Sequence, residues 1–227
     1  MSKSPPIGLI WFLLLAAPLA PCGCAVKSNG AGGPSNSPSR GAAGQALNRQ
    51  PLSDNAAIRQ IVEAALEQTR QTVGYDPSYV KLGYPGGDVS PEAGVCSDVV
   101  VRAFRQAGVD LQKEIHEDIS KHFKAYPNNW GAKRPDSNID HRRVPNLMKY
   151  FERQGKSAKL TRTARDYVPG DLVAWDLGGG VLHIGLVTDA LAAGAERYML
   201  VHNIGNGARL EDVLFSWKII GHYRCFK

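Results

Sequence analysis

The segment Pro169-Gly170-Asp171-Leu172-Val173-Ala174-Trp175 begins a part of the chain whose residue pattern changes abruptly. From here on, short apolar runs rich in β-branched and aromatic residues alternate with turns rich in glycine. Such runs are typical of β-strands, and short turns between them favour antiparallel pairing. The pattern predicts an antiparallel sheet with strands over residues 171–175, 182–188, 197–203 and 217–224.

Before this segment, apolar residues recur at the spacing of a helix rather than of a strand. The first predicted helix is capped by Ser53 or Asp54 and ends at Gly74, and the second runs from Cys96 to Gly108. Two further helices are predicted over residues 111–123 and 145–155, with a polar, turn-rich segment between them. Helices followed by an antiparallel sheet predict an α+β domain over residues 51–227.

The first fifty residues differ from the rest in composition. Residues 1–25 have a basic start, an apolar run and a small-residue end, which is typical of a secretory signal peptide. Residues 26–50 are rich in Gly, Ser, Pro and Ala and are expected to be a disordered linker. Cys22, or alternatively Cys24, follows small residues as in the lipid-modification site of bacterial lipoproteins. We therefore expect export to the periplasm or outer membrane, with a lipid anchor in the membrane; secretion without lipid is the alternative.

The chain has 227 residues and a formal net charge of +6, which by itself would suggest an acidic partner such as a nucleic acid. Four basic residues and no acidic residue precede position 51, however, which leaves +2 for the predicted domain. A phosphate-binding surface needs Lys and Arg gathered on one folded face. The distribution of charge therefore argues against a nucleic-acid partner.

Cys96 stands at the predicted start of a helix, where the helix dipole and free backbone N–H groups favour a thiolate over a thiol. A thiolate nucleophile needs a base that can also protonate the leaving group, and His suits both tasks near neutral pH. His183 and His202 lie in two predicted strands, so that one could face Cys96 while the other orients its ring. This order of residues suggests nucleophilic catalysis.

Each of these residues also has a simpler interpretation. Cys96 could be a buried apolar residue or half of a disulfide with Cys225, and a histidine in a strand is most often a hydrogen-bonded core residue. A metal site formed by His183, His202 and His222 would lack a Cys pair or a carboxylate at the usual ligand spacing. No metal and no cofactor is therefore expected.

The order of these residues resembles that of the NlpC-type cell-wall peptidases of the papain-like superfamily. In those enzymes a Tyr and a Gly-Gly pair precede the catalytic Cys, and a Pro-Gly-Asp-Leu strand precedes a His-x-Gly strand and a further strand with His. The matching residues here are Tyr84, Gly86-Gly87, Pro91, Gly94, Cys96-Ser97, Phe104, Gly108, Pro169 to Leu172, Trp175, His183 to Gly185 and His202. The resemblance implies a papain-like, NlpC-type fold with helices packed on the antiparallel sheet.

More closely, the chain from about Tyr75 to Arg224 resembles the bacterial family called domain of unknown function 1287. The similar segments are Tyr84 to Asp88, Gly94 to Cys96, Asn138 to Asn146, Val201 to Gly205 and Gly221 to Arg224. This closer resemblance implies a thiol hydrolase but no particular substrate.

By resemblance, Cys96 is the nucleophile, His183 is the general base and acid, and His202 orients His183. Tyr84 would line the site near the thiolate. The peptidases have Asp directly before the Cys, where this chain has Val95, so their specificity for stem peptides is not carried over.

The resemblance also implies that the segment near 111–165 is a helical insertion. Within it, His141, Arg142 and Arg143 could bind a substrate carboxylate, although exposed basic residues are usually only solvated.

These features lead to the hypothesis of an exported cysteine hydrolase that cleaves an amide bond in peptidoglycan peptides through an acyl-thioenzyme. Two alternatives have the same motifs. One is a cell-wall- or lipid-binding module without turnover, and the other is a thiol-dependent acyltransferase.

Overall fold

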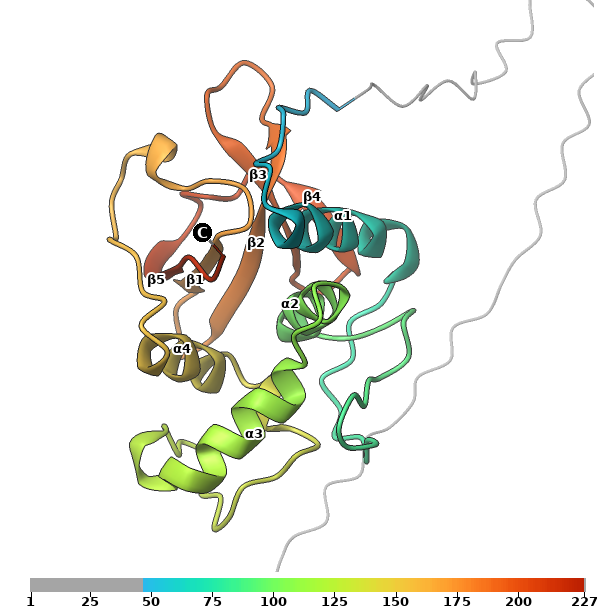
Figure 1. Cartoon of the computed structure of the whole chain (residues 1–227), viewed down its shortest axis with the longest axis vertical. Helices are drawn as coiled ribbons and strands as arrows, with labels where there is room; N and C mark the ends of the chain where they lie inside the picture. Colours follow the sequence, from blue (N-terminus) through green and yellow to red (C-terminus); the bar gives the residue numbers. More distant parts are fainter. Residues whose placement is uncertain (1–46, 227) are drawn as a thin grey trace, which may run out of the picture. The chain divides into compact units, whose positions relative to one another are not determined.

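Helices come first and strands second along the chain (Figure 1). The computed structural model describes residues 47–226. The helices are α1 (Ala56–Gln71), α2 (Cys96–Gln106), α3 (Leu111–His122) and α4 (Val144–Arg153). The strands are β1 (Leu172–Asp176), β2 (Leu182–Leu191), β3 (Tyr198–Asn203), β4 (Ala208–Glu211) and β5 (Lys218–Tyr223). The α+β class predicted from the sequence is confirmed.

The strands form one antiparallel sheet in the order β4-β3-β2-β1-β5. All of them except β4 lie where the sequence predicts strands. The sequence predicts only a turn at Gly205-Asn206-Gly207, because the four residues of β4 are too few to show an alternating pattern. This short strand matters for the site, since it brings Glu211 to the side of β3.

Successive side chains of each strand enter two different apolar clusters, one on each face of the sheet. On one face, Ile184 and Val201 pack in the cluster that includes the apolar sides of α1 and α2. Figure 1 shows these two helices lying across β2, β3 and β4. On the other face, Trp175 and Leu200 pack with Leu214 from the loop before β5. Alternate residues along each strand therefore join different clusters.

The cap of α1 differs from the prediction. Asn55, rather than Ser53 or Asp54, is the N-cap residue, and its side chain accepts hydrogen bonds from the first backbone N–H groups of the helix. All three residue types are good caps, so composition alone could not choose among them. The helix also ends before the predicted Gly74, so that Val73 lies beyond its end and is 71% exposed.

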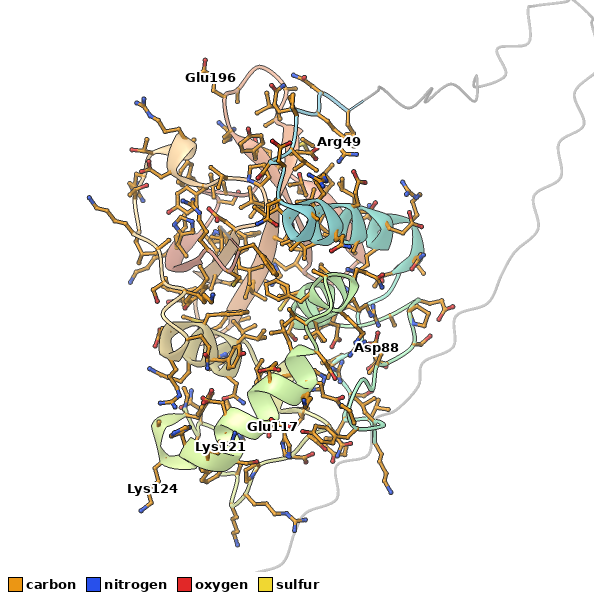
Figure 2. The ribbon with its side chains drawn as sticks, viewed as in Figure 1. Arg49, Asp88, Glu117, Lys121, Lys124 and Glu196 are labelled. Carbon is orange, nitrogen blue, oxygen red and sulfur yellow. The ribbon has the colours of Figure 1, made fainter. Side chains whose placement is uncertain are left out.

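The folded part of the chain begins slightly earlier than the predicted boundary at residue 51. The backbone N–H of Gln50 donates to the carbonyl of Asp189 at 2.9 Å. Arg49 forms ion pairs with Asp189 at 2.8 Å and with Glu63 at 2.5 Å, and Figure 2 shows it beside the start of α1. These last residues of the predicted linker thus have partners in the domain.

The predicted signal peptide, most of the linker, and the candidate lipidation residues Cys22 and Cys24 lie outside the described residues. Within residues 47–226, no helix combines the length and the apolar character needed to cross a bilayer.

The segment between α2 and β1, which the resemblance presents as an insertion, holds α3 and α4. Figure 2 shows its residues Glu117, Lys121 and Lys124 at the outer end of the domain. The same segment includes a 3₁₀ turn at Asp140–Arg142, which packs against both α3 and α4. This turn brings Arg142 to the start of α2.

Candidate active site

Cys96 is the first residue of α2 and is 5% exposed. Backbone N–H groups hydrogen-bond its sulfur, and the one with the largest effect belongs to Ile184 in β2. The thiol therefore lies between the start of α2 and the strand that carries His183.

Burial raises the pKa of the Cys96 thiol to about 11, and the nearby Asp98 carboxylate acts in the same direction. The N–H groups of Ile184, Ser97 and Cys96 itself lower the pKa but do not balance burial. A helix N-terminus by itself predicts the opposite direction. Here the cost of desolvating a thiolate exceeds the benefit of the helix start, so the resting thiol is protonated at neutral pH.

The sheet brings His183 of β2 and His202 of β3 together. Nε2 of His183 lies 2.8 Å from Nδ1 of His202, and the ring centroids are 5.0 Å apart in an edge-to-face arrangement. Both side chains are buried, and the rings of Trp175 and Trp217 lie 5.7–6.5 Å from them, centroid to centroid. The two tryptophans therefore shield the contact between the histidines from solvent.

Glu211 at the end of β4 extends the histidine pair. Its Oε2 lies 2.9 Å from Nε2 of His202, a distance typical of an ion pair, although the angle is outside the range of a hydrogen bond. This arrangement assigns the tautomers: His202 carries its proton on Nε2, beside the carboxylate, and His183 donates from Nε2 to Nδ1 of His202. Nδ1 of His183 is then unprotonated and can accept a proton.

Both histidines are neutral at neutral pH. Burial, with a smaller contribution from His202, lowers the pKa of His183 to about 3. Burial also lowers the pKa of His202, while the charge and proximity of Glu211 act against this shift. A neutral imidazole is the form that a general base requires.

The two histidines contact each other in the structure, but neither of them is hydrogen-bonded to Cys96. Within residues 47–226, no hydrogen bond joins the Cys96 sulfur to either imidazole. His183 stands opposite Trp175 in the β1–β2 ladder, so its side chain points to the face of the sheet that Trp175 occupies. The Cys96 side chain packs with Ile184 in the cluster on the helix-covered face. The thiol thus touches the main chain of β2 directly beside His183.

The His-x-Gly motif has a steric reason at Gly185. A Cβ at this position would lie 3.2 Å from Cβ of His202 and 3.2 Å from the indole of Trp175. The absence of a side chain lets both residues approach β2 closely. Gly185 therefore permits the packing that holds the histidine pair.

A cavity of about 360 Å³ opens beside Cys96. Its wall is largely apolar and aromatic and also contains two arginines; it includes Tyr75, Val95, Trp130, Arg143 and Leu182. A ligand in this cavity would reach the thiol.

The structure places Tyr75, rather than the expected Tyr84, beside the thiol. Tyr84 packs edge to face on His116 of α3, with ring centroids 5.2 Å apart, and is 43% exposed. Tyr75 lines the cavity with Cys96, and its pKa is raised chiefly by burial, with a smaller contribution from the Asp98 carboxylate. The sequence could not separate these two tyrosines, because both lie in the same Gly- and Pro-rich loop.

Arg142 has a position that favours a structural role over the expected substrate contact. Its guanidinium donates to both oxygens of Asp98 at 3.0 Å each and to the backbone carbonyls of Ser78 and Asp76 at 2.8 and 2.9 Å. The Ser97 hydroxyl donates to the carbonyl of Arg142 at 2.7 Å. Both members of the ion pair are buried, so the guanidinium is engaged within the protein.

His141, the histidine expected to bind substrate, is 2% exposed. Its Nδ1 has no hydrogen-bond partner among the described residues, and burial lowers the pKa of the side chain to about 4. An enclosed, neutral imidazole is poorly suited to bind a carboxylate at neutral pH. Of the three basic neighbours at 141–143, Arg143 alone remains suited to bind a substrate carboxylate.

The other candidate groupings are separate. Cys96 and Cys225 are both free thiols, so they do not form the disulfide of the simpler interpretation. His222 contacts Asp171 through Nε2 at 2.8 Å and the carbonyl of Lys159 through Nδ1 at 3.0 Å, and it does not contact the histidine pair. Within residues 47–226, no cluster of three or more His, Cys, Asp or Glu side chains is arranged to hold a metal ion.

Sequence reasoning did not single out Tyr75 or Glu211. Glu211 is diagonal to His202 across the β3–β4 ladder, because His202 pairs with Arg209 and Leu200 pairs with Glu211. Residues 209 and 211 lie on the same face of β4 as His202 does on β3, and this alternation would have indicated Glu211. The signal could be used only once strand β4, which was not predicted, was known.

Comparison with known sequences gives a family but no activity. The profile of the family described as "Domain of unknown function (DUF1287)" matches residues 62–225, which include Cys96, His183 and His202. The chain is also similar to "Uncharacterized protein YijF" of Escherichia coli (strain K12). The two are 54% identical over 166 residues, which cover 73% of this chain and 80% of that protein.

Proposed function

We propose that this chain, which belongs to the DUF1287 family, is a thiol-dependent amide hydrolase with the papain-like architecture of the NlpC-type peptidases. The observation that carries the proposal is the 2.8 Å contact between His183 of β2 and His202 of β3. The backbone of β2, at Ile184, also hydrogen-bonds the Cys96 sulfur. A nucleophile at a helix start, a base on a neighbouring strand and a third group that orients the base are the parts of one catalytic arrangement.

In the proposed reaction, the Cys96 sulfur attacks the carbonyl carbon of an amide while its proton passes to Nδ1 of His183. The C–N bond then breaks, the imidazolium gives its proton to the leaving amine, and a thioester remains on Cys96. Water attacks the thioester with His183 again as base, the C–S bond breaks, and a carboxylic acid and the thiol are released. The backbone N–H of Cys96 at the start of α2, which is directed at its own sulfur in the resting site, is the proposed donor to the tetrahedral oxyanion.

Because the Cys96 thiol and the His183 imidazole are both neutral at rest, the thiol proton moves to His183 during the attack and not before it. The imidazolium formed in that step is stabilised by His202, which in turn has the Glu211 carboxylate beside it. At rest the two side chains point to different faces of the sheet, so the proposed reaction requires the His183 side chain or the start of α2 to move when the substrate binds. Contacts between catalytic groups often form fully only in the complex with substrate.

The proposed substrate is a peptide of the cell wall, and the proposed location is the envelope outside the inner membrane. This part rests on the apolar segment within residues 1–25 and on the candidate lipid acceptors Cys22 and Cys24. A lipid anchor on either cysteine would keep the domain at a membrane surface facing the wall.

A binding module without turnover is the second candidate. It is favoured by one observation, namely that no described hydrogen bond joins Cys96 to His183. In this alternative the cavity beside Cys96 binds a wall peptide, and the histidine pair only stabilises the sheet.

Digestion of purified sacculi separates the two candidates. With the full-length protein, we expect soluble muropeptides whose masses identify the cleaved bond, and a loss of at least about 100-fold in their release for Cys96→Ser. Cys225→Ser is the matched control, because it removes the other described thiol, and its activity should be unchanged. Equal release by wild type and Cys96→Ser would reject the hydrolase, and binding of both to sacculi would then support the module.

A further inference from the structure

Arg143 is an unpaired cation at the cavity that Cys96 lines. Its guanidinium carbon lies 3.9 Å above the centroid of the Trp130 ring, a cation–π geometry. Its guanidinium has no hydrogen bond and no ion pair with any described residue, and the side chain is half-buried. Both Arg143 and Trp130 line the cavity beside Cys96.

The neighbours of Arg143 leave its charge available. Asp136 and Asp140 are near enough to act on its pKa, but both carboxylates have other partners. Asp140 contacts Nδ1 of His116 at 3.1 Å and accepts the N–H of Asp136 at 2.7 Å. Asp136 accepts the hydroxyl of Tyr79 at 3.0 Å.

Among the described residues, no carboxylate lines the cavity itself. The other cation in its wall, Arg142, is neutralised by its buried pair with Asp98. Of the described residues that line the cavity, Arg143 is therefore the one cation without a direct ion pair, and an aromatic ring holds its guanidinium in place.

We infer that Arg143, stacked on Trp130, binds a carboxylate of the substrate, so that the cavity recognises a peptide with an acidic group next to the amide that Cys96 attacks. A guanidinium fixed by stacking has lost part of its conformational freedom in advance, and its planar donors match a carboxylate. The apolar wall, which includes Val95 and Leu182, fits the aliphatic part of such a residue. Short peptides that end in a free α-carboxylate have this chemistry. This inference rests on the proposed function for its reaction, but its binding step can be measured without turnover.

The test compares two ligands that differ only in charge, N-acetyl-D-alanyl-D-alanine and its C-terminal amide. Binding of each to the full chain carrying Cys96→Ala is measured by calorimetry, so that hydrolysis does not interfere. We expect the acid to bind roughly 10- to 100-fold more tightly than the amide, as for a charge-assisted hydrogen bond to Arg. Arg143→Gln should remove this preference by weakening the acid alone, and Arg143→Lys should retain part of it.

Arg162→Gln is the matched control, because Arg162 is exposed and does not line the cavity, so the same charge is removed outside it. It should leave both affinities unchanged. Trp130→Leu should weaken binding of the acid about as much as Arg143→Lys does, because the guanidinium loses its support.

Equal affinity of the acid and the amide for the protein would overturn the inference, as would an equal preference in wild type and Arg143→Gln. These outcomes are distinct from failure of the hydrolase. If sacculi are not digested while the acid still binds through Arg143, the reaction is rejected and the carboxylate site stands. If sacculi are digested but the preference is absent, the hydrolase stands and the carboxylate site is rejected.

Discussion

Burial acts on Cys96 and His183 in opposite directions, since it raises the pKa of the thiol to about 11 and lowers that of the imidazole to about 3. Each shift favours the uncharged form, because a charge in the apolar interior has lost its hydration. At the residue scale, then, the resting site holds a neutral thiol beside a neutral base. A helix start alone would have suggested a thiolate that is present before substrate binds.

The pH dependence of alkylation tests this state. In a Cys225→Ser background, the rate at which iodoacetamide modifies Cys96 should rise about tenfold per pH unit from pH 7 to pH 9, because only the thiolate reacts. Mass spectrometry of the modified peptide gives the rate, with Cys96→Ser in the same background as the unlabelled control. A rate that levels off below pH 8.5 would instead indicate a thiolate–imidazolium pair in the resting protein.

At the scale of elements, one buried ion pair joins three segments that are distant in sequence. Arg142, from the 3₁₀ turn before α4, bonds Asp98 in the first turn of α2 and the backbone of the loop at Asp76 and Ser78. Asp98 also accepts the N–H of Val95 at 2.7 Å, just before Cys96. The pair therefore fixes the start of α2 and with it the position of the thiol.

Breaking this pair from one side should be costly. Asp98→Asn leaves the Arg142 charge buried without its counter-charge, and we expect the free energy of unfolding to fall by about 3–5 kcal/mol in urea titrations. Glu67→Gln is the control, because it breaks the exposed pair with Arg70 and should change stability by less than about 0.5 kcal/mol. A loss below about 1 kcal/mol for Asp98→Asn would contradict the assigned role.

At the scale of the whole molecule, buried neutral histidines make stability depend on pH. Burial lowers the pKa of His183 to about 3, that of His141 to about 4, and that of His202 also. The unfolded chain takes up these protons near the ordinary histidine pKa, about 6.5, whereas the folded chain does not. Stability is therefore complete above this pH and is lost as the pH falls toward 4. Burial raises the pKa of Asp140, so the folded chain takes up one proton there before the unfolded chain does, which opposes this loss of stability.

Urea unfolding at pH 7.5, 6.5, 5.5 and 4.5 should show this loss, with each buried histidine contributing up to about 1.4 kcal/mol per pH unit. His141→Asn should reduce the slope between pH 6 and 4.5 by about one proton. A wild-type stability that does not vary over this range would show that the histidines are accessible to protons in the folded state.

The elements could be predicted because their signals are local. The helical spacing up to Gly108, the Pro near the start of α4 and the short apolar run of β2 are all contained in short windows. The failures have local causes as well. Three consecutive residues, Ser53 to Asn55, are all good helix caps, so the sequence cannot choose among them. Strand β4 has only four residues, which are too few to show an alternating pattern.

The sequence by itself determined the α+β class, the strand positions of His183 and His202, and the placement of Cys96 at a helix start, since each depends on neighbouring residues. The tertiary structure alone decided which groups meet. It placed Tyr75 rather than Tyr84 at the cavity, engaged Arg142 with Asp98 while leaving Arg143 unpaired, and reversed the expected pKa shift of the thiol. The physical reason is that burial and pairing depend on contacts between segments far apart in the chain, which no local pattern encodes.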